Sequence, residues 1–235
     1  MARQAQSFEG ISVWTLEQTS IEPVEAEPLP EVPPIGSPAE AHRALFESVG
    51  ADVVDDFGRL VAEVRGLEIA RSDAITGQLE IGVGTADREL HGYVHSGTDP
   101  SEFLAKAADF ARSIRSSGAP GHPLNRQGRQ RWLRSAAFHD PSLLNAGILE
   151  MLPPLDSRVL QLGPEPAAAI DRSTNTLYVF VAGVDPEAVP VASDYQLRHT
   201  PAATVIVTTE LDRFPATEEI AASVGIRTRA LPSPW

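Results

Sequence analysis

Cysteine is absent from this chain of 235 residues, and lysine occurs once, at Lys106. Without cysteine the chain forms neither a disulfide nor a thiolate metal site, so its fold does not depend on an oxidising compartment. No stretch approaches 18 apolar residues, and no basic region followed by an apolar one opens the sequence. We therefore expect neither a membrane span nor a secretory signal, and we take the cytoplasm as the location.

The charge of the chain is acidic and unevenly distributed. The net charge of −13 disfavours nonspecific attraction to phosphate backbones. Residues 1–40 carry seven glutamates against one arginine. The window from Phe110 to His139 has the opposite character, with six arginines and no acidic residue. Any binding of nucleic acid is therefore expected at that window.

Residues 1–36 have the composition of an acidic, proline-rich leader. Six prolines lie between Pro23 and Pro38, interleaved with glutamates that repel one another. Proline fixes the backbone and removes hydrogen-bond donors, so we expect a disordered segment. In the alternative, part of the leader docks as a short strand through a small apolar group: Phe8, Ile11, Val13, Trp14 and Leu16.

The next part, residues 37–117, is predicted to be a small α+β domain. A capping box at Ser37-Pro38-Ala39-Glu40 predicts a helix to Val49. A second helix is predicted from Ala51 to Gly66, because six apolar residues recur at helical spacing: Val53, Val54, Phe57, Leu60, Val61 and Val64. Two strands are expected at 67–71 and 78–83, and a further helix begins at Asp99-Pro100.

The last part, residues 118–235, is predicted to be an α/β domain. A glycine-, serine- and proline-rich segment at 116–123 separates it from the preceding part. Helices are expected at 126–138, 186–198 and 215–224, and strands at 148–152, 167–170, 176–182, 203–208 and 226–231. Strands that alternate with helices indicate a mixed sheet with parallel members and flanking helices.

Three consecutive segments of this last part stand in the order helix, turn, strand: Arg131-Trp132-Leu133-Arg134, Asp140-Pro141-Ser142-Leu143-Leu144 and Ile148-Leu149-Glu150-Met151-Leu152. They resemble the opening of a restriction-endonuclease-like (PD-(D/E)XK) domain, of the type found in mismatch-directed endonucleases. The match covers about residues 126–232. In that family a hairpin with the metal-binding aspartate follows, then a strand that ends in Glu-x-Lys, then a helix with glutamine and tyrosine.

The resemblance implies the fold without its chemistry. The family's carboxylates hold Mg²⁺ against the scissile phosphate, and its lysine helps to activate water. In this chain the hairpin turn of the family corresponds to residues 171–175, and its metal aspartate to Pro166, which lies beside Glu165. The family's Glu-x-Lys corresponds to Val181-Ala182-Gly183. Its glutamine corresponds to Val191, and its tyrosine is present as Tyr195. We therefore expect no catalytic residue and no cofactor here. Asp171 is either a lone metal ligand or a turn residue that bonds its own backbone.

The ordered chain also resembles a protein family of GC-rich bacteria, a resemblance that implies no activity. Six segments carry it: Gly66-Leu67-Glu68-Ile69-Ala70-Arg71, Leu79-Glu80-Ile81-Gly82-Val83-Gly84, Asp87-Arg88-Glu89, His122-Pro123-Leu124-Asn125, Arg131-Trp132-Leu133-Arg134 and Gly183-Val184-Asp185.

One cluster of polar residues has the composition of a metal site. Asp87, Glu89, His91 and His95 lie within nine residues, and on a helix the two histidines would share a face. Gly92 replaces the glutamate that follows the first histidine in metalloprotease helices, and it disfavours the helix itself. The alternatives are a metal or acid–base site and a polar surface beside a strand end.

The arginine window supplies the candidate nucleic-acid-binding residues. On a helix from 126 to 138, Arg126 and Arg129 form one pair and Arg131 and Arg134 a second, while Trp132 lies on the side of the first pair. The guanidinium groups could hold phosphates and the indole could stack on a base. In the alternative, Trp132 anchors the core and the arginines pair with acidic residues.

These patterns predict a non-catalytic accessory or scaffold protein, linked to DNA metabolism by fold analogy alone. The first alternative is a protein-interaction module without a nucleic-acid role, in which the leader and residues 231–235 bind other proteins. The second alternative is a metal-dependent enzyme that uses Asp87, Glu89 and His95. We expect a protein partner, with DNA as a second candidate and no membrane.

Overall fold

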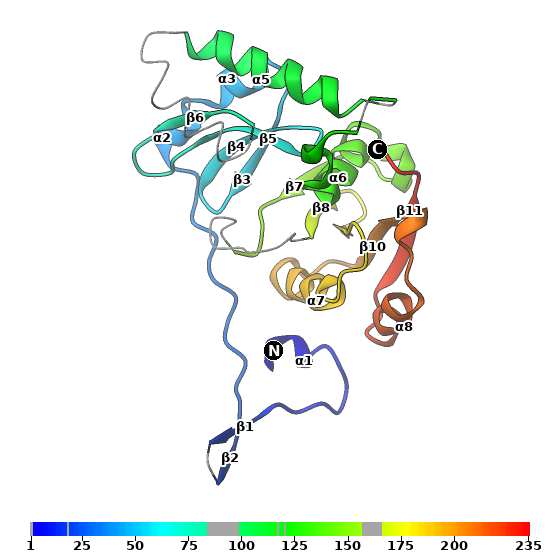
Figure 1. The fold of residues 1–235 in the computed structure, drawn as a ribbon. Coiled ribbons are helices and arrows are strands. Elements are labelled where there is room, and N and C mark those ends of the chain that lie inside the picture. The colour runs from blue at the N-terminus through cyan, green and yellow to red at the C-terminus, as the bar shows by residue number, and fades with distance from the viewer. Residues whose placement is uncertain (1, 18, 84–98, 117, 120, 157–165) are drawn as a thin grey trace.

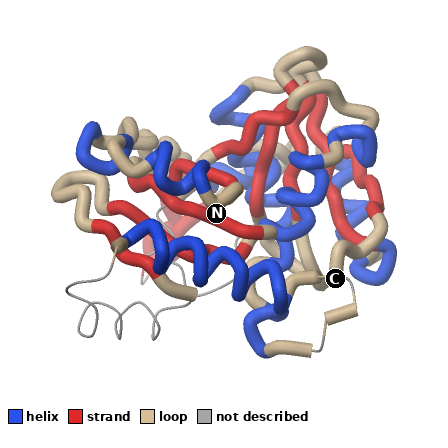
Figure 2. The backbone as a smooth tube through the Cα atoms, turned by 90° about the horizontal axis from the view of Figure 1, so that it is seen from above, coloured by secondary structure: helices blue, strands red, loops and turns tan. Residues whose placement is uncertain are grey.

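The computed structural model describes residues 2–17, 19–83, 99–116, 118–119, 121–156 and 166–235. It is a mixed α/β structure with a two-stranded hairpin, a four-stranded antiparallel sheet and a five-stranded mixed sheet. Figure 2 shows the two larger sheets as separate groups of strands with helices around them.

The four-stranded sheet is a meander of β3 (Asp52–Asp56), β4 (Arg59–Val64), β5 (Leu67–Ser72) and β6 (Leu79–Ile81). The predicted helix from Ala51 to Gly66 is therefore wrong. Burial alternates strictly along β3, and its valines are β-branched, which favours a strand. The chain reverses at Phe57 and Gly58, both at positive φ, and the Gly58 amide donates to Asp55 over 2.8 Å.

The helices of this part are α2 (Ser37–Glu40), α3 (Arg43–Ser48) and α5 (Pro100–Ile114). The predicted helix to Val49 exists as two short pieces, and the capping box is absent, because Gly36 occupies the cap position and Glu40 pairs with Arg43. Asp99 caps α5 as expected, accepting from the Ser101 amide over 2.9 Å. Helix α5 packs on β4, β5 and β6, and its buried residues Leu104, Ala108 and Ala111 belong to that core.

The five-stranded sheet has the order β11-β10-β9-β8-β7. Its strands are β7 (Leu149–Leu152), β8 (Ala167–Asp171), β9 (Thr176–Phe180), β10 (Ala203–Thr209) and β11 (Arg227–Leu231). Strand β8 runs antiparallel to both of its neighbours, β7 and β9, and β9, β10 and β11 run parallel. All five lie within two residues of the predicted ranges, so the predicted mixed sheet is confirmed.

Helices cover both faces of this sheet. Helix α6 (Arg129–His139) packs on one face, where Leu133 and Ala137 meet Ala169 and Phe180. Helices α7 (Ala188–His199) and α8 (Pro215–Ser223) cover the opposite face, on a core that includes Ile170 and Ile206. Three short 3₁₀ turns complete the described helices: η1 (Pro123–Arg126), η2 (Pro141–Leu144) and η4 (Glu210–Asp212).

The leader follows a defined path where the sequence predicts disorder. It forms α1 (Ala2–Ala5), then a hairpin of β1 (Trp14–Glu17) and β2 (Ser20–Pro23), then a segment without helix or strand to Gly36. Figure 1 shows the hairpin far from both larger sheets and the following segment climbing toward β3. The strand from the apolar group therefore pairs within the leader, and disorder in solution stays a prediction.

None of the described helices combines the length and the apolar character that a membrane crossing requires.

Candidate functional site

The end of the five-stranded sheet, where the resemblance would place the metal ligands of an active nuclease, is built from apolar residues. Ala167 pairs with Phe180, so the start of β8 and the end of β9 lie side by side. Pro166 is buried, Val181 is 2% exposed, and Gly183 turns the chain away at φ +78°. Glu165 lies outside the described residues. The described side chains at these positions carry no atom that could bind a hard cation or a proton.

Three carboxylates near this end are engaged elsewhere. Asp185 accepts from the Glu187 amide over 2.9 Å, Asp212 accepts from the Thr209 hydroxyl over 2.8 Å, and Glu218 pairs with Arg213 at 2.8 Å. Burial raises the pKa of Asp185. The cavity they line has a volume of only about 10 Å³. Within the described chain no group of three or more metal-ligating side chains occurs.

Asp171, the lone candidate ligand of the hairpin, organises the hairpin turn. One carboxylate oxygen accepts from the Ser173 amide at 2.9 Å and its hydroxyl at 2.6 Å. The other accepts from the Gly147 amide and from the Thr174 hydroxyl, both at 3.1 Å. The Ser173 hydroxyl contributes most to lowering the pKa of Asp171 from 3.8 to about 2. These contacts match the alternative in which Asp171 bonds its own backbone.

Replacing Asp171 by asparagine should lower the free energy of unfolding by about 2 kcal/mol at pH 7, because hydrogen bonds to a charged acceptor are lost. The unfolded aspartate binds a proton at a higher pH than the folded one does, so this contribution is complete above pH 4. The difference between wild type and Asp171→Asn should shrink as the pH falls from about 4 to about 2. Urea unfolding across this range measures it, and the exposed Asp109→Asn serves as the control. A constant difference at every pH would contradict the assignment.

Tyr195, at which the resemblance keeps a tyrosine, is fully buried. Its hydroxyl donates to the Pro153 carbonyl over 3.0 Å, and its ring stacks near His199 with centroids 6.1 Å apart. The tyrosine thus anchors α7 to the segment that follows β7.

Arg131 and Arg134, the second arginine pair of the window, form an ion cluster with Glu63 of the four-stranded sheet. Glu63 on β4 is 1% exposed, and its two oxygens bind Arg134 at 2.8 Å and Arg131 at 3.2 Å. The Arg134 side chain is also 1% exposed. A guanidinium group in this position cannot reach a phosphate on the surface.

Trp132 and Arg129 of the window are also held by contacts within the protein. Trp132 is 4% exposed, with the Arg115 guanidinium 4.9 Å above its ring and the Trp235 ring 5.9 Å away. Arg129 lies 5.1 Å over Trp235 and donates to the Asn125 carbonyl over 3.0 Å. Arg126 is exposed at the end of η1. The contacts match the core and ion-pair alternative.

Arg115, which the sequence did not single out, is a fully buried cation at the end of α5. Its guanidinium donates to the carbonyls of Arg65 at 2.6 Å and Leu124 at 2.9 Å, and to that of Gln127. Desolvation by burial, followed by the repulsion of Arg131, lowers its pKa to about 10. Arg115 therefore remains charged at neutral pH and ties α5 to two turns.

A polar cleft of about 460 Å³ lies beside this cluster, and Asp52, Ser135 and His139 line it. The Ser135 hydroxyl donates to Asp52 over 2.6 Å, and the His139 Nε2 lies 2.7 Å from the other Asp52 oxygen. Burial raises the pKa of Asp52, against the hydrogen bond from Ser135. The serine contacts the carboxylate and not the imidazole, so the arrangement differs from a nucleophile activated by histidine.

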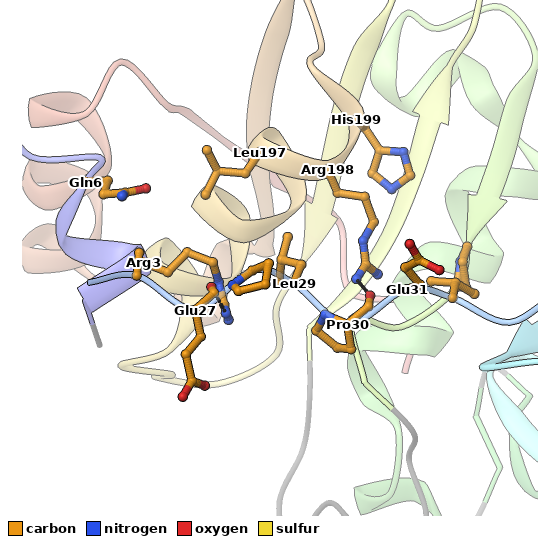
Figure 3. A pocket seen from close by; sticks show the side chains of 13 residues that line it. Arg3, Gln6, Glu27, Leu29, Pro30, Glu31, Leu197, Arg198 and His199 are labelled. Atoms are coloured by element: carbon orange, nitrogen blue, oxygen red, sulfur yellow. Dashed lines mark hydrogen bonds between the residues drawn. The ribbon is translucent and has the colours of Figure 1, made fainter. Parts of the chain in front are cut away.

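A larger groove of about 740 Å³ lies between the leader and α7 (Figure 3). Arg3 binds the buried Asp194 of α7 through two hydrogen bonds, of 2.7 and 3.0 Å. Arg198 donates to the Pro30 carbonyl over 2.6 Å, and Leu29 packs on the core beneath α7. Burial lowers the pKa of His199 at the same helix end. No sequence pattern indicates this groove, because Arg3 and Asp194 are 191 residues apart.

The cluster of Asp87, Glu89, His91 and His95 lies outside the described residues. Its interpretation as a metal site therefore stays a prediction.

Comparison with known proteins yields no match: no family model, no curated protein and no solved structure matches this chain. The fold and the sites thus define a mixed α/β protein with a polar junction beside its four-stranded sheet and a groove beneath its leader.

Proposed function

We propose that this protein is a non-catalytic accessory or scaffold protein, built on a degenerate restriction-endonuclease-like core, and that it acts through protein contacts. The order of elements supports the ancestry of the core. Helix α6, turn η2, strand β7, hairpin β8–β9 and helix α7 follow one another as in the family that the sequence resembles.

The observation that carries the proposal is the apolar character of the sheet end. Ala167 beside Phe180 brings together the two strand ends that hold the metal and the lysine in active members of the family. Pro166, Val181 and Gly183 occupy that place, and the cavity next to them is too small for a phosphodiester. Fixed metal ligands and room for the substrate are both needed for metal-assisted hydrolysis.

The contacts of the arginines argue against a nucleic-acid interface. Arg131, Arg134 and Arg115 are held in internal contacts, and Arg112 pairs with Asp109 and the Val49 carbonyl. Arg126 is exposed, and the Arg112 side chain is 38% exposed beside Asp109. With a net charge of −13, two exposed arginines, one of them paired with an aspartate, make a weak electrostatic footprint for DNA.

The hairpin of the leader favours a protein partner. Trp14, Leu16 and Ile21 are 58%, 69% and 65% exposed, and Leu16 faces Ile21 across the two strands. Trp14 stands opposite Pro23 on the same side of the hairpin. Apolar side chains grouped on an exposed surface are typical of a binding site for another protein.

A salt-titrated binding assay against single- and double-stranded DNA tests the proposal. We expect no saturable binding at about 150 mM salt, and no change on replacing Arg126 and Arg129 by alanine. An interface of four free arginines would instead give a slope of log K against log salt near −3 to −4 on duplex DNA. Such a slope, reduced by Arg126→Ala, would favour the DNA-linked alternative. A metal-dependent enzyme that uses Asp87, Glu89 and His95 would instead show bound metal.

A further inference from the structure

The polar cleft beside α6 gathers guanidinium groups from two parts of the chain. Arg65 lies in the turn between β4 and β5, and Arg112 and Arg115 lie at the end of α5. All three line the cleft of about 460 Å³, together with Trp132 and Ser135 of α6. A concave site with a few convergent polar groups is the usual form of a binding site for a small molecule.

The arginines of the cleft lack a buried acidic partner within the described chain. The Arg65 guanidinium donates to the Arg115 carbonyl, and that of Arg115 donates to three main-chain carbonyls. Arg112 donates to the Val49 carbonyl and pairs with Asp109 at 3.1 Å. The Asp109 side chain is 79% exposed, so water weakens this pair. The positive charge of the three arginines is therefore incompletely balanced.

The two carboxylates that line the cleft have other partners. Glu63 binds Arg131 at 3.2 Å and Arg134 at 2.8 Å. Asp52 accepts from the Ser135 hydroxyl over 2.6 Å. The cleft arginines donate instead to main-chain carbonyls and to one exposed aspartate. The acids of the cleft thus leave its guanidinium groups available to an anion from outside.

Arg115 shows the imbalance most clearly. Its side chain is fully buried, yet its Nε has no hydrogen-bond acceptor among the described residues. Burial, followed by the repulsion of Arg131, lowers the pKa of Arg115 to about 10. The carbonyls that hold its other two nitrogens carry no net charge. A buried cation without an acidic partner is costly, and an anion in the cleft would offset part of that cost.

We infer that this cleft binds a small molecule through an oxyanion, a carboxylate or a phosphate, which the half-buried Arg112 and the exposed Arg65 hold above the buried charge of Arg115. Guanidinium groups suit either oxyanion, because their planar fork matches two oxygens at once. The inference goes beyond the proposed function, since it gives the protein a ligand that a contact with a protein partner does not require.

The test titrates the full chain with inorganic phosphate and, separately, with acetate, against sodium chloride of equal ionic strength. Calorimetry should give a dissociation constant near or below about 1 mM for at least one of the two anions. At ten times that concentration the melting temperature should rise by roughly 3–6 °C. Tighter binding of phosphate would assign a phosphate-bearing ligand, and tighter binding of acetate a carboxylate.

Two variants should shift the affinity in opposite directions. Arg65→Gln combined with Arg112→Gln removes two cations and should weaken binding at least about tenfold. Asp52→Asn removes a negative charge from the cleft and should tighten binding roughly threefold. A general loss of folding cannot produce opposite shifts. Arg172→Gln, which removes an exposed arginine paired with Glu150, is the matched control and should leave the affinity unchanged.

A response to phosphate and acetate no larger than the response to chloride would overturn the site. An affinity that either cleft variant leaves unchanged would overturn it too. Saturable binding of duplex DNA that the double glutamine variant abolishes would replace the small ligand by nucleic acid. These readouts do not depend on Mg²⁺ or on DNA cleavage, so the inference and the proposed function can fail separately.

Discussion

Replacing Glu63 by alanine should lower the free energy of unfolding by about 3–5 kcal/mol, the largest loss that we expect from a single charged residue. Glu63 and Arg134 are each 1% exposed and lie 2.8 Å apart, and Arg131 shares the carboxylate. Removal of the carboxylate leaves two arginines against the sheet without their acidic partner, which is the costly way to break a buried ion pair. Urea unfolding at pH 7 measures the loss.

The matched control is Glu150→Ala, which also removes a glutamate from a pair with arginine. Glu150 and Arg172 lie 2.7 Å apart, but both side chains are more than half exposed. An exposed pair is worth about 0–1 kcal/mol. Equal losses in Glu63→Ala and Glu150→Ala would show that the Glu63 cluster does not stabilise the junction between β4 and α6.

Replacing Gly66 by alanine should be similarly damaging, for a steric reason. Gly66 lies in the turn between β4 and β5 at φ +70°, and an added Cβ would lie 2.2 Å from the Trp132 amide nitrogen and 2.3 Å from the Arg131 carbonyl carbon. Backbone atoms of a helix cannot move aside as a flexible side chain can. The turn must therefore separate from α6, which also strains the Glu63 cluster.

Gly225→Ala measures the cost of the left-handed backbone conformation alone, without a steric overlap. Gly225 has φ +73°, but no atom lies within 4 Å of its added Cβ. We expect Gly225→Ala to cost about 1–2 kcal/mol through the left-handed conformation alone. Gly66→Ala should cost about 2 kcal/mol more because of the overlap. The two variants should be compared by urea unfolding, and equal costs would contradict the close approach of the turn to α6.

The C-terminal strands could be predicted because their signals are local. Runs such as Thr176–Phe180 combine β-branched and aromatic residues, and prolines at the helix starts mark the boundaries. The hairpin from Asp52 to Val64 cannot be predicted, because its apolar residues satisfy helical spacing as well as alternation. Its turn places Phe57 at positive φ, a conformation that the sequence pattern does not predict for a phenylalanine.

The candidate sites could not be predicted, since they depend on pairs that are distant in sequence. Glu63 and Arg134 are 71 residues apart, Asp52 and His139 are 87 apart, and Arg3 and Asp194 are 191 apart. The sequence did offer the core and ion-pair alternative for Trp132 and the arginines, but it could not name their partners. Asp52 and Glu63 lie in the segment for which the sequence pattern predicts a helix, so their positions on neighbouring strands could not be predicted.

The proposal of a degenerate, non-catalytic nuclease core is tested most directly by a cleavage assay on the full chain. Supercoiled, linear and single-stranded DNA are incubated with Mg²⁺, and EDTA samples serve as the control. The account predicts no strand breakage above the EDTA control in any substrate. Mg²⁺-dependent breakage that EDTA abolishes would contradict it.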